Sequence, residues 1–175
     1  MQILNHENIH QRVIEELVLE AKQRVWIATA NLKNMHIKAF RGYKPILDEF
    51  NTMASRGVSF RVVHADKMSE SFHRTLSEYL LLKKNLEIQV CPRSHWKMVI
   101  VDGRAAYFGS ANFTGAGLGV KNENKRNLEL GALITDKKAG DKAQIAQLEL
   151  LFDNFWMGEH CPQCERRKYC LSPIA

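Results

Sequence analysis

The sequence of 175 residues lacks any apolar run that approaches the length of a membrane span. Its N-terminus, which begins Met1-Gln2-Ile3-Leu4, also lacks the basic and apolar regions of a secretory signal peptide. No internal repeat and no low-complexity segment occurs. These absences predict a cytoplasmic protein that makes no stable association with a membrane.

Acidic residues are in deficit: 19 Asp and Glu face 25 Lys and Arg, which leaves a formal net charge of +6. Such a surplus favours polyanionic partners, and nucleic acid, either DNA or RNA, is the first of them. Hydrophobic residues make up 45% of the chain, which is ample for a sizeable core. The length predicts one globular domain.

Hydrophobic periodicity predicts helices and strands that alternate along most of the chain. We expect helices at 7–22, 45–56, 69–84 and 137–157, and strands at 24–30, 58–64, 86–90, 96–101, 104–109 and 127–135. The basic stretch 31–44 and the Gly- and Asn-rich stretch 115–126 are expected to be loops. We divide the chain into a catalytic domain, 1–157, and a Cys-rich C-terminal tail, 158–175.

A histidine, a lysine and small polar residues stand at close spacing between positions 95 and 112. The stretch reads H-x-K-x4-D-x6-G-S-x-N, and its fixed positions are His95, Lys97, Asp102, Gly109, Ser110 and Asn112. A neutral imidazole can attack phosphorus without charge repulsion and form a covalent phospho-histidine. On a strand, Lys97 would share a face with His95 and set an ammonium against the phosphate oxygens. Ser110 and Asn112 would add neutral hydrogen-bond donors, so the pattern predicts phosphodiester chemistry.

Asp102-Gly103 is typical of the turn of a β-hairpin. The turn would join a strand at 96–101 to a strand at 104–109. We therefore interpret Asp102 and Gly109 as structural members of the pattern, despite their place beside the chemical ones.

The whole pattern resembles the signature of the phospholipase D superfamily, the HKD phosphodiesterases. The resemblance covers 1–157 and implies an α/β fold, a mixed β-sheet flanked by helices on both faces, in its single-repeat form. It also makes Asn127-Leu128-Glu129 the segment whose acid orients the catalytic histidine. The implied catalytic residues are His95, Lys97, Asn112 and Glu129, and the implied phosphate-binding residues are Lys97, Ser110 and Asn112.

The motif occurs once, although the mechanism needs two imidazoles. One attacks phosphorus, and the other protonates the leaving oxygen and then activates water. Short members of the superfamily, such as the small bacterial nucleases, pair two chains about a two-fold axis. The resemblance therefore implies a homodimer with one composite active site and no metal in the chemistry. Joined to the basic composition, it indicates a metal-independent endonuclease.

Two other functions remain open. A phospholipid hydrolase or phosphatidyl transferase would use the same motif, but the sequence lacks a membrane segment and a second motif. A non-catalytic nucleic-acid-binding module could keep the fold, but it would not need an intact motif.

Cysteines are few, and three of the four lie in the tail as Cys161, Cys164 and Cys170, spaced C-x2-C-x5-C. In a reducing compartment, clustered cysteines indicate a metal more than disulfides. The spacing resembles the C-terminal cysteine run of iron–sulfur nucleases of the RecB type, which implies Cys91 as a remote fourth ligand. A structural zinc held with Cys91 or His160 fits equally well, and free thiols are the third alternative.

Overall fold

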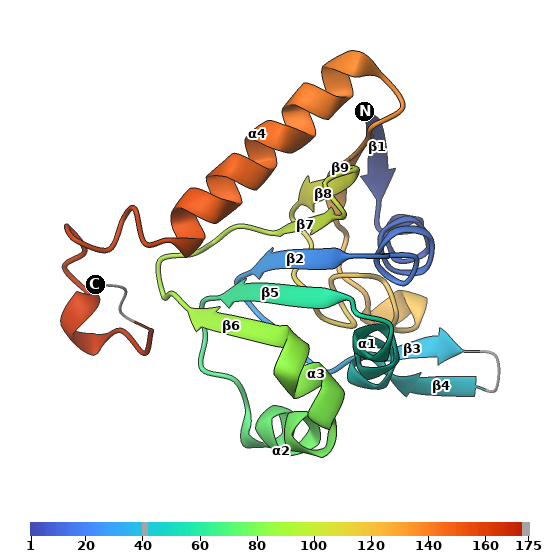
Figure 1. Cartoon of the computed structure of the whole chain (residues 1–175). Helices are drawn as coiled ribbons and strands as arrows, with labels where there is room; N and C mark the ends of the chain where they lie inside the picture. The colour runs from blue at the N-terminus through green and yellow to red at the C-terminus, as the bar shows by residue number, and fades with distance from the viewer. Residues whose placement is uncertain (40–41, 173–175) are drawn as a thin grey trace.

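The computed structural model describes residues 1–39 and 42–172, and its centre is a seven-stranded mixed sheet (Figure 1). The strands are β1 (Gln2–Asn5), β2 (Arg24–Thr29), β5 (Ser59–His64), β6 (Leu86–Val90), β7 (Met98–Val101), β8 (Ala105–Gly109) and β9 (Leu130–Thr135). They lie in the order β1-β9-β8-β7-β2-β5-β6. β2, β5 and β6 are parallel, and every other neighbouring pair is antiparallel.

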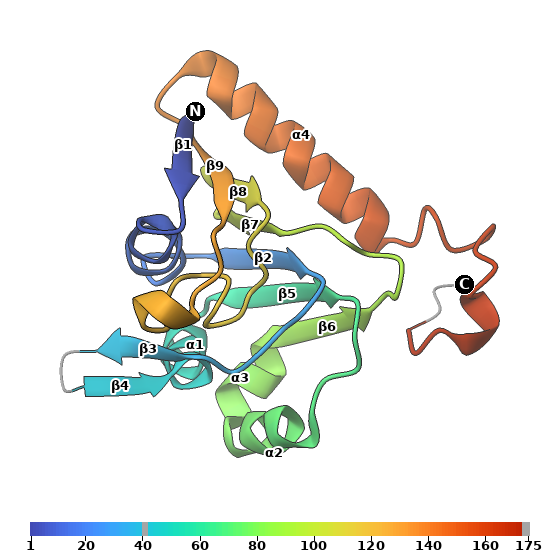
Figure 2. The ribbon, with the colours of Figure 1, turned by 180° about the vertical axis from the view of Figure 1, so that it is seen from behind.

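Helices cover both faces of this sheet (Figures 1 and 2). The long helix α4 (Ala139–Trp156) packs on one face. The other face carries the π-helix η1 (His10–Val18), α1 (Ile46–Ser55), α2 (Glu70–Glu78) and α3 (Leu80–Asn85). The predicted α/β architecture is thus confirmed. No helix within the described residues is long and apolar enough to cross a membrane.

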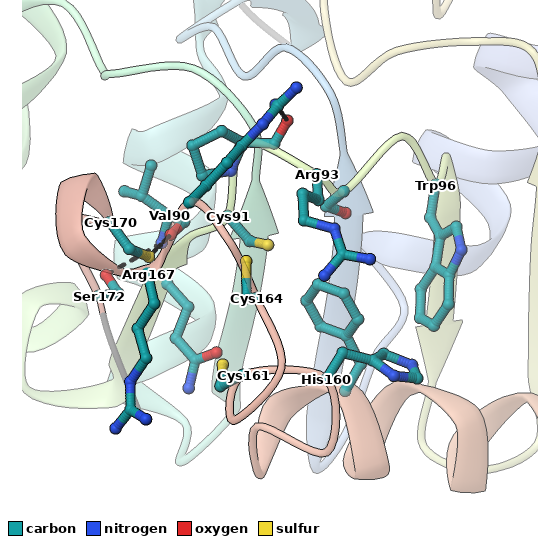
Figure 3. A pocket seen from close by; sticks show the side chains of 15 residues that line it. Val90, Cys91, Arg93, Trp96, His160, Cys161, Cys164, Arg167, Cys170 and Ser172 are labelled. Atoms are coloured by element: carbon teal, nitrogen blue, oxygen red, sulfur yellow. Dashed lines mark hydrogen bonds between the residues drawn. The ribbon is translucent and has the colours of Figure 1, made fainter. Parts of the chain in front are cut away.

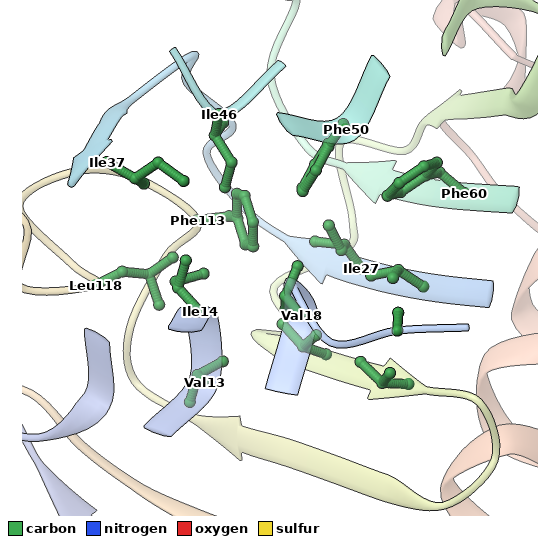
Figure 4. Close-up of a cluster of buried hydrophobic side chains, with 14 of the residues drawn as sticks. Val13, Ile14, Val18, Ile27, Ile37, Ile46, Phe50, Phe60, Phe113 and Leu118 are labelled. Atoms are coloured by element: carbon green, nitrogen blue, oxygen red, sulfur yellow. The ribbon is translucent and has the colours of Figure 1, made fainter. Parts of the chain in front are cut away.

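Strand alternation divides the apolar side chains between two cores. On β2, Val25 and Ile27 join the core under η1 and α1, whereas Trp26 faces α4. In the first core, the rings of Phe50 and Phe60 stack with centroids 4.6 Å apart (Figure 4). Each such buried side chain contributes roughly 1.5–3 kcal/mol relative to exposure.

The second core is rich in aromatic rings. Trp26 stacks on Phe152 of α4 with centroids 5.0 Å apart. Trp96, just before β7, packs on Phe155 at the same centroid distance. The Trp96 contact joins α4 to the segment that carries His95, and the Trp26 contact joins α4 to β2.

The stretch 31–44, expected to be an irregular loop, instead contains a hairpin of β3 (His36–Ala39) and β4 (Gly42–Pro45). Residues 40 and 41 lie outside the described residues. The expectation was wrong because one side chain gives the hairpin an anchor: Ile37 is buried in the first core. Its basic neighbours Lys33 and Lys38 remain exposed and hid this signal.

The helix expected at 69–84 is also wrong as a single element, because the chain turns at Tyr79 between α2 and α3. The new helix start is supported from α1, where Asn51 Oδ1 accepts a hydrogen bond from the Leu82 N–H at 3.0 Å. The turn lets Phe72 and Leu82 both reach the first core.

The sheet gathers the motif at one edge. β2, β5, β6 and β8 end at this edge, and β7 and β9 begin there. His95 and Lys97 precede β7, Ser110 and Asn112 follow β8, and Glu129 precedes β9. Residues 96 and 97 were expected to be part of the strand, yet β7 begins only at Met98.

Asp102 occupies the turn between β7 and β8 at the opposite edge, with a positive φ of 55°. Its carboxylate accepts hydrogen bonds at 2.8 Å from the backbone N–H groups of Lys22, Gln23 and Arg24. These are charge-assisted bonds to donors at the start of β2 and just before it, so one side chain joins the hairpin turn to β2.

We predict that Asp102→Ala lowers the free energy of unfolding by about 2–4 kcal/mol, because three backbone donors lose a charged acceptor. Urea titration followed by circular dichroism measures the change. The matched control is Asp136→Ala, which removes a surface ion pair with Arg104 at 2.9 Å and should cost less than about 1 kcal/mol. Equal losses in the two variants would contradict the structural role of Asp102.

Candidate active site

His95 and Lys97 lie side by side in an extended segment that is pinned to β8. The Lys97 carbonyl accepts a hydrogen bond from the Gly109 N–H at 3.0 Å. Lys97 Nζ lies 3.3 Å from His95 Nδ1 and donates to the His95 carbonyl at 3.0 Å. His95 is exposed and Lys97 is half-buried, so the pair presents an imidazole and an ammonium at the surface.

Burial lowers the pKa of Lys97, and the nearby Glu129 carboxylate opposes this effect by raising it. Because the net direction is downward, the Lys97 ammonium gives up its proton at a lower pH than a free lysine does. The charge that Lys97 can offer a phosphate is therefore lost earlier as the pH rises.

Glu129 is the buried acid of the site, with only 9% of its surface exposed. One carboxylate oxygen accepts a hydrogen bond from Ser110 Oγ, and the other accepts one from Asn127 Nδ2 at 3.0 Å. Ser110 Oγ in turn accepts from the Leu130 N–H at 3.1 Å. In the described part of one chain, no hydrogen bond joins Glu129 to His95.

Asn112 is oriented by Thr29 and Asn31, which belong to no sequence motif. Its Oδ1 lies 3.3 Å from Thr29 Oγ1 and accepts from the Asn31 N–H at 3.2 Å. Thr29 Oγ1 also accepts from the Phe113 N–H at 2.9 Å. Because Oδ1 of Asn112 already takes part in these contacts, its amide Nδ2 is the atom left to donate a hydrogen bond to a ligand. The sequence held one signal of this support: the apolar strand 24–30 contains a polar residue, Thr29, near its end.

Gly109 is required by close packing between β8 and β9. A Cβ at this position would lie 2.5 Å from the Leu130 carbonyl oxygen and 2.8 Å from the Tyr107 hydroxyl. Gly131 faces the same ring, since its Cβ would lie 2.4 Å from Tyr107 Cε2. Burial, which outweighs the opposing backbone of Ala111, raises the pKa of Tyr107 to about 12. The two glycines thus leave room for the buried ring of Tyr107 beside β9.

An open groove of about 380 Å³ lies beside the histidine. Trp96, Phe108, Leu148 and Leu151 supply most of its apolar wall. Phe108 and Leu151 are 37% and 47% exposed. His95 and Lys97 therefore open onto an apolar surface rather than a closed cavity.

The four cysteines line a second pocket, which shares Trp96 with this groove. Cys91, Cys161, Cys164 and Cys170 all line one pocket, with His160 at its rim (Figure 3). All four cysteines lie among the described residues, and all four are free thiols. Among the described residues, no three His, Cys, Asp or Glu side chains are arranged to hold a metal ion. The zinc or iron–sulfur assignment stays a prediction.

We predict that Gly109→Ala destabilises the fold by about 1–3 kcal/mol, because its Cβ forces β9 and Tyr107 apart. Urea unfolding measures this loss. Gly140→Ala, in the first turn of α4, is the control: its Cβ meets nothing within 4 Å, and it should be neutral or add up to about 1 kcal/mol. A Gly109→Ala protein as stable as the native one would contradict the packing argument.

Comparison with known proteins tests the family assignment. The family model described as "Cardiolipin synthase, PLD-like domain" matches residues 14–156. No curated protein matches the chain. The fold is similar to NucT from Helicobacter pylori, with 15% identity and a TM-score of 0.58 over 89% of this chain and 96% of that one. It is also similar to Nuc from Salmonella typhimurium, a phospholipase D family member, with 16% identity and a TM-score of 0.58 over 89% and 92%.

A third similar structure is TrmBL2, an archaeal chromatin protein whose structure shows "a novel mode of DNA binding". Identity is 15% and the TM-score 0.56 over 89% of this chain and 52% of that one, so this chain spans about half of TrmBL2. These structural similarities bear on the fold alone, and they agree with the α/β architecture. The family match covers most of the sequence and confirms the resemblance carried by the motif: the chain belongs to the family of phospholipase D-like domains.

Proposed function

We propose that this protein is a phosphodiesterase that cleaves nucleic acid through a covalent phospho-histidine, in an active site shared by two copies of the chain. The observation that carries the proposal is the convergence of His95, Lys97, Asn112 and Glu129 at one edge of the sheet. The roles below are assigned on that geometry.

The first step is attack of the His95 imidazole on phosphorus, which forms a P–N bond and breaks the bond to the leaving oxygen. The Lys97 ammonium lies 3.3 Å from the imidazole and would neutralise charge on the non-bridging oxygens. The Asn112 amide, held through its carbonyl oxygen, would donate to the same phosphate. A water molecule then cleaves the P–N bond and regenerates the imidazole.

Ser110 was predicted to bind phosphate, but its hydroxyl proton is directed at Glu129. In this arrangement Ser110 holds the carboxylate, and a phosphate would have to compete for that proton. The phosphate-binding role of Ser110 stays a prediction. The immediate effect of the contact is to fix Glu129 close to Lys97.

The tautomer of His95 argues for a second chain. For His95 Nε2 to attack phosphorus, Nδ1 must carry the proton, and that N–H needs a hydrogen-bond acceptor. The group beside Nδ1 is the Lys97 ammonium, which has no lone pair. Within the described residues, Glu129 of the same chain makes no hydrogen bond to His95, although each of its oxygens can accept more than the one bond it receives from Ser110 or Asn127. A carboxylate brought by a second copy would complete the site, and Glu129 of the partner subunit is the acid we assign.

The second copy would also bring the imidazole that protonates the leaving oxygen. Apolar side chains around the site offer a surface for it: Leu128 and Leu130, which flank Glu129, are 85% and 61% exposed. Leu130 starts β9, which pairs with β8, and Phe108 of β8 lines the apolar groove with Leu151. Exposed apolar side chains of this kind often mark protein–protein contact.

Nucleic acid is the substrate class that the charges favour. A groove of about 550 Å³ begins at Asn31, beside Asn112, and is lined by Lys33 and Lys67 as well as Asp66. The chain has a net charge of +6. The groove could therefore bind the backbone of a polyanion whose scissile phosphate lies at His95 and Lys97. Phospholipid is the second candidate, because the groove of about 380 Å³ beside His95 is apolar.

We predict that the purified protein cuts labelled DNA or RNA in EDTA and leaves phospholipid vesicles intact. His95→Ala should lower the rate by about 10⁴-fold or more, because the nucleophile is lost. Binding should weaken as salt rises, since phosphate contacts release counterions.

The control for this assay is His36→Ala, which removes an exposed histidine of β3 and should leave the rate unchanged. Cleavage of vesicles alone would favour the lipid enzyme. Binding of nucleic acid without any cleavage would favour a non-catalytic module. Activity only with added Mg²⁺ would contradict the histidine mechanism.

We predict that an isolated heterodimer of one native and one His95→Ala chain is nearly inactive, because each composite site uses both histidines. Two affinity tags isolate the mixed species after the chains are exchanged, and light scattering checks that it is a dimer. A heterodimer with half the native activity would show that each chain works alone. An active monomer at assay concentration would contradict the shared site directly.

A further inference from the structure

The C-terminal tail is fastened to the strand and turn that lead into His95. The Cys170 thiol donates to the Val90 carbonyl at 3.6 Å, and Ser172 Oγ accepts from the Val90 N–H at 3.1 Å. Arg166 donates to the Pro92 carbonyl at 3.3 Å. These contacts place the three tail cysteines against Cys91, which stands four residues before the catalytic histidine.

The tail has little apolar surface of its own to order it. Its 3₁₀ turn η3 (Arg167–Tyr169) buries no side chain, and Tyr169 and Leu171 are 75% and 62% exposed. Fixing the backbone of each residue costs about 1–2 kcal/mol. A few hydrogen bonds, each of roughly 1 kcal/mol, do not offset that cost. A bound metal centre, which contributes on the order of 10 kcal/mol, would.

The donor set is sulfur from two distant parts of the chain. Cys91, Cys161, Cys164 and Cys170 line one pocket of about 210 Å³ (Figure 3). Arg93, Arg166 and Arg167 line the same pocket. Four thiolates carry more negative charge than one divalent ion balances, and adjacent guanidinium groups can neutralise the remainder.

The two kinds of centre differ in how far apart they hold their sulfur ligands. Four sulfurs around one zinc ion lie about 2.3 Å from it, and so about 3.8 Å from one another. Among the described residues, no three Cys, His, Asp or Glu side chains are placed to hold a metal ion in this arrangement, and the Cys170 thiol is directed at the Val90 carbonyl. The thiols would therefore have to turn toward one another to bind any centre, and the four cysteines line one space of about 210 Å³ in which they could do so. An iron–sulfur cluster takes four cysteine ligands spread over several metal atoms, and such a pocket suits it.

We infer that Cys91, Cys161, Cys164 and Cys170 ligate one iron–sulfur cluster, which fastens the tail behind the segment that carries His95. His160, at the rim of the pocket, is not a ligand. The inference is independent of the proposed nuclease activity, because it concerns the metal content of the folded chain.

The test is the metal content of the full chain, purified without oxygen and also reconstituted with ferrous iron and sulfide. We expect iron and acid-labile sulfide in about equal amounts, with a visible absorption band. His95→Ala protein should have the same content, so a failed activity assay does not bear on this result. Stoichiometric zinc without sulfide would overturn the cluster in favour of a single ion.

Substitutions identify the ligands. Cys91→Ser and Cys164→Ser should each bring bound iron to background, whereas His160→Ala should keep the native content. Ser172→Ala is the control for loosening of the tail, because it removes the hydrogen bond to Val90 but leaves every thiol in place. It should also keep the native iron content. Full iron content in Cys91→Ser would overturn the assignment of that ligand. Native protein that holds no metal, with all four thiols titratable, would overturn the whole inference.

Discussion

The pairing of β7 with β2 on one side and β8 on the other is the constraint on which the site depends. It sets the start of β7 beside the ends of β2 and β8, so that Lys97, Thr29 and Ser110 reach one edge of the sheet. The backbone bond from Gly109 to Lys97 extends this pairing past the strand. At the opposite edge, Asp102 holds the turn to the first residues of β2. The geometry of the chemical groups therefore follows from backbone hydrogen bonds, which tolerate little displacement.

A single chain supplies charged groups and hydrogen-bond donors to this site, but the site they form is incomplete. The acid Glu129 is buried and held by Ser110 and Asn127, and the imidazole of His95 has an ammonium as its neighbour. A buried carboxylate needs such partners, because its desolvation is costly. Within the described residues, no group accepts a hydrogen bond from the ring nitrogens of His95. The proposed second copy of the chain would supply such an acceptor.

The sequence was sufficient for the motif, the family and the layered α/β fold, because these depend on residue identity at fixed spacing and on apolar periodicity. It was insufficient where tertiary contact decides. The strand β1 has four residues and one buried side chain, Leu4, so it carries little pattern. The support of Asn112 by Thr29 joins residues 83 positions apart. The contact of Ser110 with Glu129 changes what each was expected to do, and spacing alone does not determine such a partner.

The central claim is that His95 forms a covalent bond to phosphorus. The most direct test is to incubate the protein with nucleic acid labelled at its internal phosphates, quench in base to preserve the acid-labile P–N bond, and map the label by mass spectrometry. We predict label on the peptide that contains His95, and none in His95→Ala protein. Rapid cleavage without label on any histidine would contradict the account, because the phosphate would then pass to water in a single step.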